Sequence, residues 1–277
     1  MEKLDARLNV FREDLADDSL RGRVDARSFA MGQPVSISVA VASVHQSPKT
    51  DAVQITQALF GEAALVFERD KGWAWIKLKR DGYVGYVPEQ ALGAPVTPTH
   101  RVANVSTILF ADANLKSQPA QHLFLGSEVA VAKTQGTYAC LATWGAVHSA
   151  HLSRLGQYEM DFVSVAERFL HVPYYWGGKT HGGIDCSSLV QISLQAAGIE
   201  ALRDSDMQEN SLGTGLADHS KLQRGDLVFW PGHVGIMQSQ SQIIHANGHH
   251  MKVTSEPLND VIKRSDKPIR SVKRLSD

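Results

Sequence analysis

Short segments in which apolar and polar residues alternate fill residues 32 to about 155, separated by glycines and other turn residues. Alternation with a period of two predicts β-strands that bury one face. From about residue 158 the apolar segments become longer, and helices are predicted over 161–170 and 187–197, the second ending at Gly198. Strands are predicted at 226–230, 233–237 and 242–246. The expected fold class is α+β: β-rich domains, then a core in which a helix is followed by an antiparallel sheet.

The β-rich part contains a weak internal repeat. Residues 57–60 (Gln-Ala-Leu-Phe) recur as residues 121–124 (Gln-His-Leu-Phe), and glycines follow each copy at similar intervals. Two units of about sixty residues predict two small β-barrels. The linker is expected at 94–98, where two prolines favour extended backbone. We therefore predict four parts: an N-terminal arm lying against the body (1–31), β-domains at 32–96 and 97–156, and an α+β domain at 157–277.

Composition narrows the functional classes. Hydrophobic residues make up 43% of the 277 residues and the formal net charge is −1, so no basic footprint for nucleic acid or an anionic membrane is present. The two cysteines are too few for a disulfide framework. Because the first residues are charged and lack a continuous apolar run, the expected location is cytoplasmic, with neither a membrane nor nucleic acid as partner.

Cys186 is placed where a glycine-containing loop turns into the second predicted helix. Unpaired backbone N–H groups and the positive end of the helix dipole at that position favour the reactive thiolate. A nearby imidazole would complete a catalytic pair by taking up the thiol proton. A single cysteine is more often a small buried hydrophobe, so the assignment depends on the residues around it.

Two histidines twelve residues apart could supply that imidazole. His233 opens a predicted strand in which Val234 and Ile236 are expected to face the core, which leaves His233 toward a groove. An odd-numbered loop centred on Ser239 would make His233 and His245 cross-strand neighbours on one face, whereas an even-numbered loop would put them on opposite faces. A neighbouring His245 could accept the ring N–H of His233 and fix its tautomer.

The cluster of His245, His249 and His250 could form a metal site, with Cys186 or Asp226 as further ligands. The sequence lacks the Cys-x-x-Cys and His-Glu-x-x-His spacings typical of zinc sites. The sequence therefore predicts neither a metal nor another cofactor.

Five ordered segments resemble the NlpC-type cell-wall peptidases, which have a papain-like α+β core. They are Tyr-Tyr-Trp-Gly-Gly (174–178), Gly-Ile-Asp-Cys-Ser-Ser-Leu-Val (183–190), Gly-Asp-Leu-Val-Phe-Trp (225–230), Gly-His-Val-Gly-Ile (232–236) and Ile-His-Ala (244–246). The resemblance implies that Cys186 is the nucleophile, His233 the base and His245 the third polar residue. It also implies that Tyr174 and the Cys186 backbone N–H form the oxyanion hole.

Gly-Tyr-Val-Gly-Tyr-Val-Pro (82–88) resembles bacterial SH3-like domains, and the second β-domain does so more weakly. Asp-Cys-Ser (185–187) and Arg-Asp-Ser-Asp-Met-Gln (203–208) are similar to the branch that pairs such domains with this catalytic core, the γ-D-glutamyl-L-diamino acid endopeptidases. That branch implies that Asp185, Ser187 and Ser205 bind the free amino group of an N-terminal L-alanine in a murein stem peptide. The resemblance also implies that the bond between γ-D-glutamate and the following diamino acid is cut. The expected biological role is the recycling of muropeptides. Diaminopimelate and lysine both remain open as the diamino acid.

Residues of the first β-domain could also reach that amine pocket, and Glu62, Tyr83 and Tyr86 are the candidates, with barrel packing as the competing interpretation. The tryptophans Trp73, Trp75 and Trp144 are expected in the core. Two other functions stay open. One is an exported hydrolase that acts on intact peptidoglycan and uses the SH3-like domains for targeting; the other is a wall-binding protein without catalysis.

Overall fold

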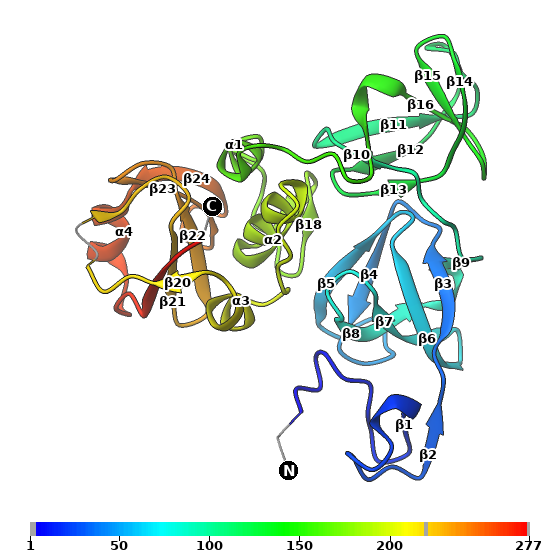
Figure 1. Ribbon diagram of the computed structural model, residues 1–277, viewed down its shortest axis with the longest axis horizontal. Helices are drawn as coiled ribbons and strands as arrows, with labels where there is room; N and C mark the ends of the chain where they lie inside the picture. The colour runs from blue at the N-terminus through cyan, green and yellow to red at the C-terminus, as the bar shows by residue number, and fades with distance from the viewer. Residues whose placement is uncertain (1–3, 219–220, 276–277) are drawn as a thin grey trace. The chain divides into compact units, whose positions relative to one another are not determined.

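The computed structural model describes residues 4–218 and 221–275. The chain divides into two compact units, residues 1–155 and 156–277 (Figure 1). The first unit is almost entirely β-structure, and the second combines helices with a six-stranded sheet and a short two-stranded one, so the chain is of the expected α+β class. In the described part of the chain, no helix is long and apolar enough to cross a membrane.

A seven-stranded sheet forms the centre of the first unit, in the order β5-β4-β8-β7-β6-β3-β9. Its strands are β3 (Gln33–Ile37), β4 (Val41–His45), β5 (Gln54–Leu59), β6 (Ala63–Asp70), β7 (Trp73–Leu78), β8 (Val84–Pro88) and β9 (Leu92–Gly93), with the 3-10 turn η2 (Glu89–Ala91) between the last two.

Two further sheets follow, in the orders β12-β11-β16-β15-β14 and β13-β10-β17. Their strands are β10 (His100–Val102), β11 (Ser106–Phe110), β12 (Pro119–Phe124), β13 (Glu128–Val129), β14 (Val131–Gln135), β15 (Tyr138–Leu141), β16 (Ala146–His148) and β17 (Leu152–Arg154), with the 3-10 turn η3 (Ser149–His151) between the last two. Both copies of the predicted repeat thus contain an antiparallel hairpin, β4–β5 or β11–β12, and close with a strand, a 3-10 turn and a strand. The closure of these sheets into barrels stays a prediction.

The N-terminal arm is extended, with the two short parallel strands β1 (Leu15–Asp17) and β2 (Ser28–Ala30) and the 3-10 turn η1 (Asp18–Leu20). Val10 is 1% exposed and packs with Phe67 and Trp75 of the seven-stranded sheet. Arg12 stacks on the Trp75 ring, 4.2 Å from its centroid. The arm therefore lies against the body, as predicted, and completes the core of the first sheet.

Most of the aromatic residues singled out in this unit pack as expected. Trp75 and Tyr83 are buried, which favours the packing interpretation for Tyr83, whereas Trp73 is only half-buried. The Glu62 side chain is also buried. Tyr86 accepts a hydrogen bond from Arg12 at 2.9 Å. Trp144 is the exception, because it is 54% exposed in the turn between β15 and β16, so its assignment to the core is wrong.

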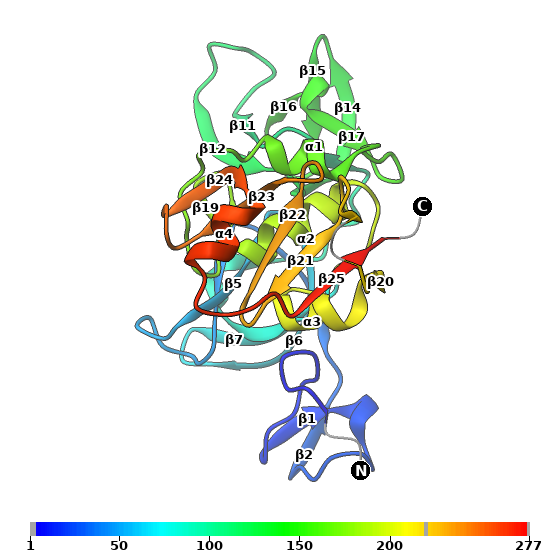
Figure 2. The same ribbon diagram turned by 90° about the vertical axis from the view of Figure 1, so that its left-hand side faces the viewer.

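In the second unit a six-stranded sheet has the order β20-β25-β21-β22-β23-β24 (Figures 1 and 2). Its strands are β20 (Thr214–Gly215), β21 (Leu227–Trp230), β22 (His233–Met237), β23 (Gln242–Asn247), β24 (Lys252–Pro257) and β25 (Ser271–Arg274). The remaining elements are α1 (Phe162–Glu167), the hairpin β18 (Lys179–Thr180) and β19 (Gly183–Ile184), α2 (Cys186–Ala196), α3 (Ser205–Ser211) and α4 (Leu258–Arg264). Both predicted helices and all three predicted strands are present, with boundaries shifted by at most a few residues.

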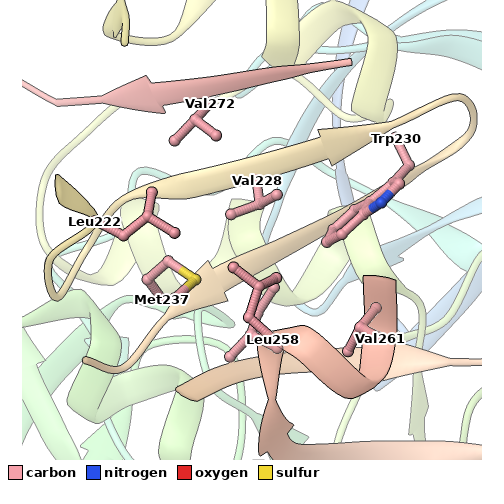
Figure 3. Close-up of a cluster of buried hydrophobic side chains, with 8 residues drawn as sticks. Leu222, Val228, Trp230, Met237, Leu258, Val261 and Val272 are labelled. Carbon is pink, nitrogen blue, oxygen red and sulfur yellow. The ribbon is translucent and has the colours of Figure 1, made fainter. Parts of the chain in front are cut away.

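Both faces of the sheet are buried. Leu258 and Val261 of α4 pack on Val228, Met237 and their neighbours (Figure 3). Val234 and Ile236, which alternate with Met237 along β22, are also fully buried. Val234 and Ile236 face the core, as predicted, and α4 covers part of the other face, on which His233 is half-buried.

The register of β22 and β23 differs from the expected one by two residues. Ile236 pairs with Ile244, and Gln238 donates its N–H to the Gln242 carbonyl, so the connecting loop has three residues and is centred on Gln240. The loop is odd-numbered, as predicted, but its centre is not Ser239. His233 and His245 therefore share a face but lie diagonally across the two strands, and Gly235 occupies the place opposite His245.

Candidate active site

Cys186 is the first residue of α2, the helix whose start the glycine loop was predicted to form. Asp185 is its N-cap, and the Asp185 carboxylate accepts the N–H of Ser188 at 2.8 Å. The helix runs for 11 residues with almost every side chain buried, and it ends before Gly198, which has φ +81°. The thiol is thus held at the start of a rigid, buried helix and is itself only 7% exposed.

Burial decides the protonation of this thiol. Burial, with the Asp185 charge acting in the same direction, raises the pKa of Cys186 to about 12. The backbone N–H groups of Val234 and Ser187 hydrogen-bond to the sulfur and act to lower the pKa, but they do not outweigh burial. The helix start favours the thiolate, as expected, but burial acts more strongly in the opposite direction, so the imidazole is needed to take up the thiol proton.

His233 and His245 come together as predicted. Nε2 of His233 lies 2.8 Å from Nδ1 of His245, and the ring centroids are 5.0 Å apart. Burial, followed by the charges of His245 and Arg264, lowers the pKa of His233 to about 3, so this imidazole is neutral at pH 7. Since Val234, which follows His233, donates its N–H to the Cys186 sulfur, the base and the thiol belong to one site.

The carboxylate of Glu256, which the sequence analysis did not identify, continues the hydrogen-bonded row that begins with His233 and His245. Nε2 of His245 lies 2.8 Å from Oε1 of Glu256 in β24, and Arg264 at the end of α4 hydrogen-bonds to the same carboxylate. Although burial acts to raise it, the hydrogen bonds from Arg264 and His245 lower the pKa of Glu256 to about 2. The alternation of residues 252–257 was visible in the sequence, but the strand pairing that brings Glu256 to His245 was not.

Tyr174 is tied to the segment that precedes the nucleophile. It forms a parallel bridge with Ile184, and its N–H donates to the Met251 carbonyl at 2.9 Å. Burial, followed by the electrostatic influence of Cys186 and Asp185, raises the pKa of the phenol above its ordinary value. Tyr174 therefore stays a hydrogen-bond donor near the sulfur, as an oxyanion-hole residue must.

Asp185 and Ser187, predicted to bind an amine, lie side by side around a buried arginine. Arg203 is 1% exposed, donates to both oxygens of Asp185 at 2.6 and 3.2 Å, and donates to Ser187 Oγ at 2.7 Å. The Asp185 carboxylate also accepts N–H groups from Gly177 at 2.9 Å and from Ser188. Arg203 belongs to the Arg-Asp-Ser run noted in the sequence, but its position as internal counter-ion of Asp185 was not foreseen.

Ser205, the third predicted amine ligand, is half-buried at the first position of α3, two residues after Arg203. The amine-binding roles of Asp185, Ser187 and Ser205 stay a prediction.

The histidines considered as metal ligands have other partners. His245 hydrogen-bonds to His233 and Glu256, and His250 lies 3.5 Å from Glu256. Among the described residues, no group of three or more His, Cys, Asp or Glu side chains is arranged to hold a metal ion.

The arrangement has the parts for acyl transfer to sulfur. The Cys186 thiol can attack a carbonyl carbon while His233 takes its proton, and Tyr174 can donate to the oxyanion that forms. Burial disfavours charge on both the thiol and the imidazole, so the thiol proton has to pass to His233 before or as the sulfur attacks. His245 and Glu256 then hold the base in place.

Comparison with known proteins agrees with this chemistry. Residues 171–267 match the NlpC/P60 family, and residues 44–92 match the family described as the bacterial dipeptidyl-peptidase Sh3 domain. These segments fall inside the predicted domains 157–277 and 32–96. The catalytic Cys, His and Tyr candidates all lie in the first segment.

Three individual proteins show how far the similarity extends. The γ-D-glutamyl-L-lysine dipeptidyl-peptidase of Bacillus cereus is 24% identical over 237 residues, covering 74% of this chain and 70% of the relative. Dipeptidyl-peptidase 6 of Lysinibacillus sphaericus is 33% identical over 110 residues, and that match spans only 40% of the relative's length. The crystal structure of an NlpC/P60 family protein from Bacillus cereus superimposes with a TM-score of 0.74 over 87% of this chain and 99% of its own, at 19% identity, which shows a shared fold.

Proposed function

Because the chain is an NlpC/P60 cysteine peptidase with a bacterial SH3 domain, we propose that it hydrolyses the γ-D-glutamyl–diamino acid bond of murein stem peptides whose N-terminal L-alanine is free. The observation that carries the proposal is the line from the Cys186 thiol at the start of α2 to the His233–His245 pair on β22 and β23. The names of the relatives from Bacillus cereus and Bacillus subtilis supply the substrate class.

In the proposed reaction the Cys186 sulfur attacks the γ-carbonyl carbon of D-glutamate, and His233 accepts the thiol proton. Tyr174 and the Cys186 backbone N–H stabilise the oxyanion. The C–N bond then breaks, His233 returns the proton to the departing amine of the diamino acid, and a thioester remains on Cys186. Water, deprotonated by His233, hydrolyses the thioester and releases L-Ala-D-Glu.

A dipeptide is released only when the amino end of the substrate is fixed two residues from the cut. We assign that recognition to the polar cluster of Asp185, Ser187 and Ser205. The Asp185 carboxylate is already paired with Arg203, so an ammonium group has to share it with a guanidinium. Ser187 contacts both members of the pair, and its oxygen can take a further partner from the substrate.

A stem peptide has a free alanine amine only after it has been released from the glycan. The substrate is therefore a fragment of the wall, and we propose that the enzyme recycles muropeptides in the cytoplasm. Cell fractionation followed by detection of the chain tests this location, and recovery in the culture medium or wall fraction contradicts it.

The test of the function uses the purified full chain and three substrates: L-Ala-γ-D-Glu-diaminopimelate, the same peptide acetylated on its amine, and intact peptidoglycan. We expect cleavage of the first alone, and C186A should abolish turnover while it leaves the thermal unfolding curve nearly unchanged. Equal cleavage of the free and the acetylated peptide would refute amine recognition. Release of peptides from intact peptidoglycan would favour the exported hydrolase instead. The lysine peptide, assayed in parallel, identifies the preferred diamino acid.

A further inference from the structure

Three polar side chains form a line that runs diagonally across the strands β22, β23 and β24. His233 Nε2 meets His245 Nδ1 at 2.8 Å, and His245 Nε2 meets Glu256 Oε1 at 2.8 Å. The register explains both steps, because Ile236 pairs with Ile244 and Ile243 pairs with Glu256, which puts all three side chains on one face. His245 is 1% exposed, so water does not reach its ring to take over either contact.

The chemistry of the partners fixes where the ring protons lie. An ionised carboxylate only accepts hydrogen bonds, so Nε2 of His245 must carry a proton to donate to Glu256. A neutral imidazole has one N–H, so Nδ1 of His245 is then an acceptor, and it receives the Nε2–H of His233. The single N–H of the neutral His233 ring is then at Nε2, so Nδ1 is unprotonated and carries a free lone pair.

We propose that Glu256 is a positioning residue that sets the tautomers of both histidines, so that Nδ1 of His233 is free to accept the Cys186 proton. The inference rests on the proposed roles of Cys186 and His233 and adds a fourth member behind them. The reverse arrangement, with a proton on Nδ1 of His245, would force the His233 proton onto Nδ1 and remove the base.

The mechanism requires that Glu256 orient His245 without protonating it. The charged and titratable groups facing the His245 ring are Glu256, Arg264, His250 and His233. Arg264 hydrogen-bonds to Glu256 and offsets its charge, and burial lowers the pKa of His245 despite the carboxylate. The Glu256–Arg264 pair thus presents an acceptor to the ring while adding little net charge.

Two substitutions of Glu256 distinguish control of the histidine tautomers from a role in packing alone. Arg264 donates to both oxygens of Glu256, so in E256Q the amide oxygen keeps only one of these hydrogen bonds. With the NH₂ group at the place of Oε1, the His245 ring must accept at Nε2 and carry its proton on Nδ1. E256D shortens the side chain but keeps a carboxylate, which only accepts hydrogen bonds. A packing role predicts that the isosteric E256Q is the milder change, whereas tautomer control predicts that E256D is.

The experiment combines ¹⁵N–¹H correlation spectra of the histidine rings with steady-state kinetics on the full-length protein, using H233Q and H245Q to assign the signals. We expect both rings to carry their protons on Nε2 in the wild type and on Nδ1 in E256Q. We expect kcat of E256Q to fall by at least about 10²-fold, compared with about 10⁴-fold when the carboxylate of a serine-protease triad is amidated. KM should change little, and E256D should keep at least about tenfold more kcat than E256Q.

The matched control is E209Q, since Glu209 is equally buried and also has an arginine and a hydroxyl partner, Arg270 and Ser271, away from the histidines. It should keep wild-type kcat and tautomers. The proposal is overturned if E256Q leaves the tautomers unchanged, if its kcat equals that of E209Q, or if E256D is the weaker enzyme. Retained turnover by C186A would instead refute the proposed function, and the tautomer spectra would not be affected by that outcome.

Discussion

The close contact between Gly235 and His245 makes the active site sensitive to a single methyl group. A Cβ at Gly235 would lie 2.6 Å from Cδ1 and 3.0 Å from Cγ1 of Ile243, and 3.2 Å from Cβ of His245. Ordinary contacts between such atoms begin near 3.4 Å, so Ile243 has to move by most of an ångström and His245 by a few tenths. G235A therefore displaces the residue that holds His233.

The expected cost follows from these distances. Overpacking of this kind destabilises proteins by about 1–3 kcal/mol, and replacing glycine within a strand returns about 0.5–1 kcal/mol. We expect G235A to lose about 1–2 kcal/mol of unfolding free energy. A displacement of a few tenths of an ångström should lower kcat roughly tenfold, since a misplacement of about 1 Å can cost about 10²-fold.

The assay measures urea unfolding together with kcat and KM on the free-amine tripeptide. G248A is the matched control, because no heavy atom lies within 4 Å of a Cβ at Gly248. I243V should restore much of the stability of G235A by removing the atom in the closest contact. The reasoning is refuted if G235A has the kcat of G248A, or if only KM changes.

Three further predictions concern the nucleophile and its surroundings. R203M should cost about 3–5 kcal/mol of unfolding free energy, because it leaves the buried Asp185 carboxylate without its counter-ion, and R203M/D185N should cost less than R203M alone; equal losses contradict the pairing. Alkylation of Cys186 by iodoacetamide should rise about tenfold per pH unit from pH 7 to 10, since the reactive thiolate forms only toward a pKa of about 12; a plateau near pH 8.5 contradicts this. Y174F should lower kcat by about 10²–10³-fold with little change in KM, and an unchanged kcat removes Tyr174 from the oxyanion hole.

Local patterns in the sequence were enough to predict the elements that carry the site. The glycine loop, Asp185 and Gly198 mark the start and end of α2 because capping residues and left-handed glycines act within a few residues. The alternation of apolar and polar residues likewise placed His233 and His245 on two strands, from which their side chains could meet on one face of the sheet. The observed register differs by two residues from the expected one, because the loop is centred on Gln240 rather than on Ser239, and no local pattern distinguishes these two centres.

The partners that complete the site are distant in the sequence, and no local pattern indicates them. Glu256 reaches His245 only because β24 pairs with β23, and Arg264 reaches Glu256 only because α4 folds back over the sheet. The burial that raises the pKa of Cys186 could not be predicted for the same reason. The dipole and N–H groups of a helix start can be predicted from the local sequence, whereas burial is a property of the tertiary structure.

The two arginine–carboxylate pairs explain why geometry, rather than charge, has to activate the thiol. Arg203 offsets Asp185 beside the nucleophile, and Arg264 offsets Glu256 behind the histidines. Each arginine offsets part of its partner's charge, and burial is the largest influence on the thiol and on the His233 ring, so that both are neutral at pH 7. A neutral pair reacts only when the imidazole lone pair points at the thiol proton as the sulfur attacks. The contacts that orient the imidazole therefore matter more to this enzyme than a preformed thiolate does.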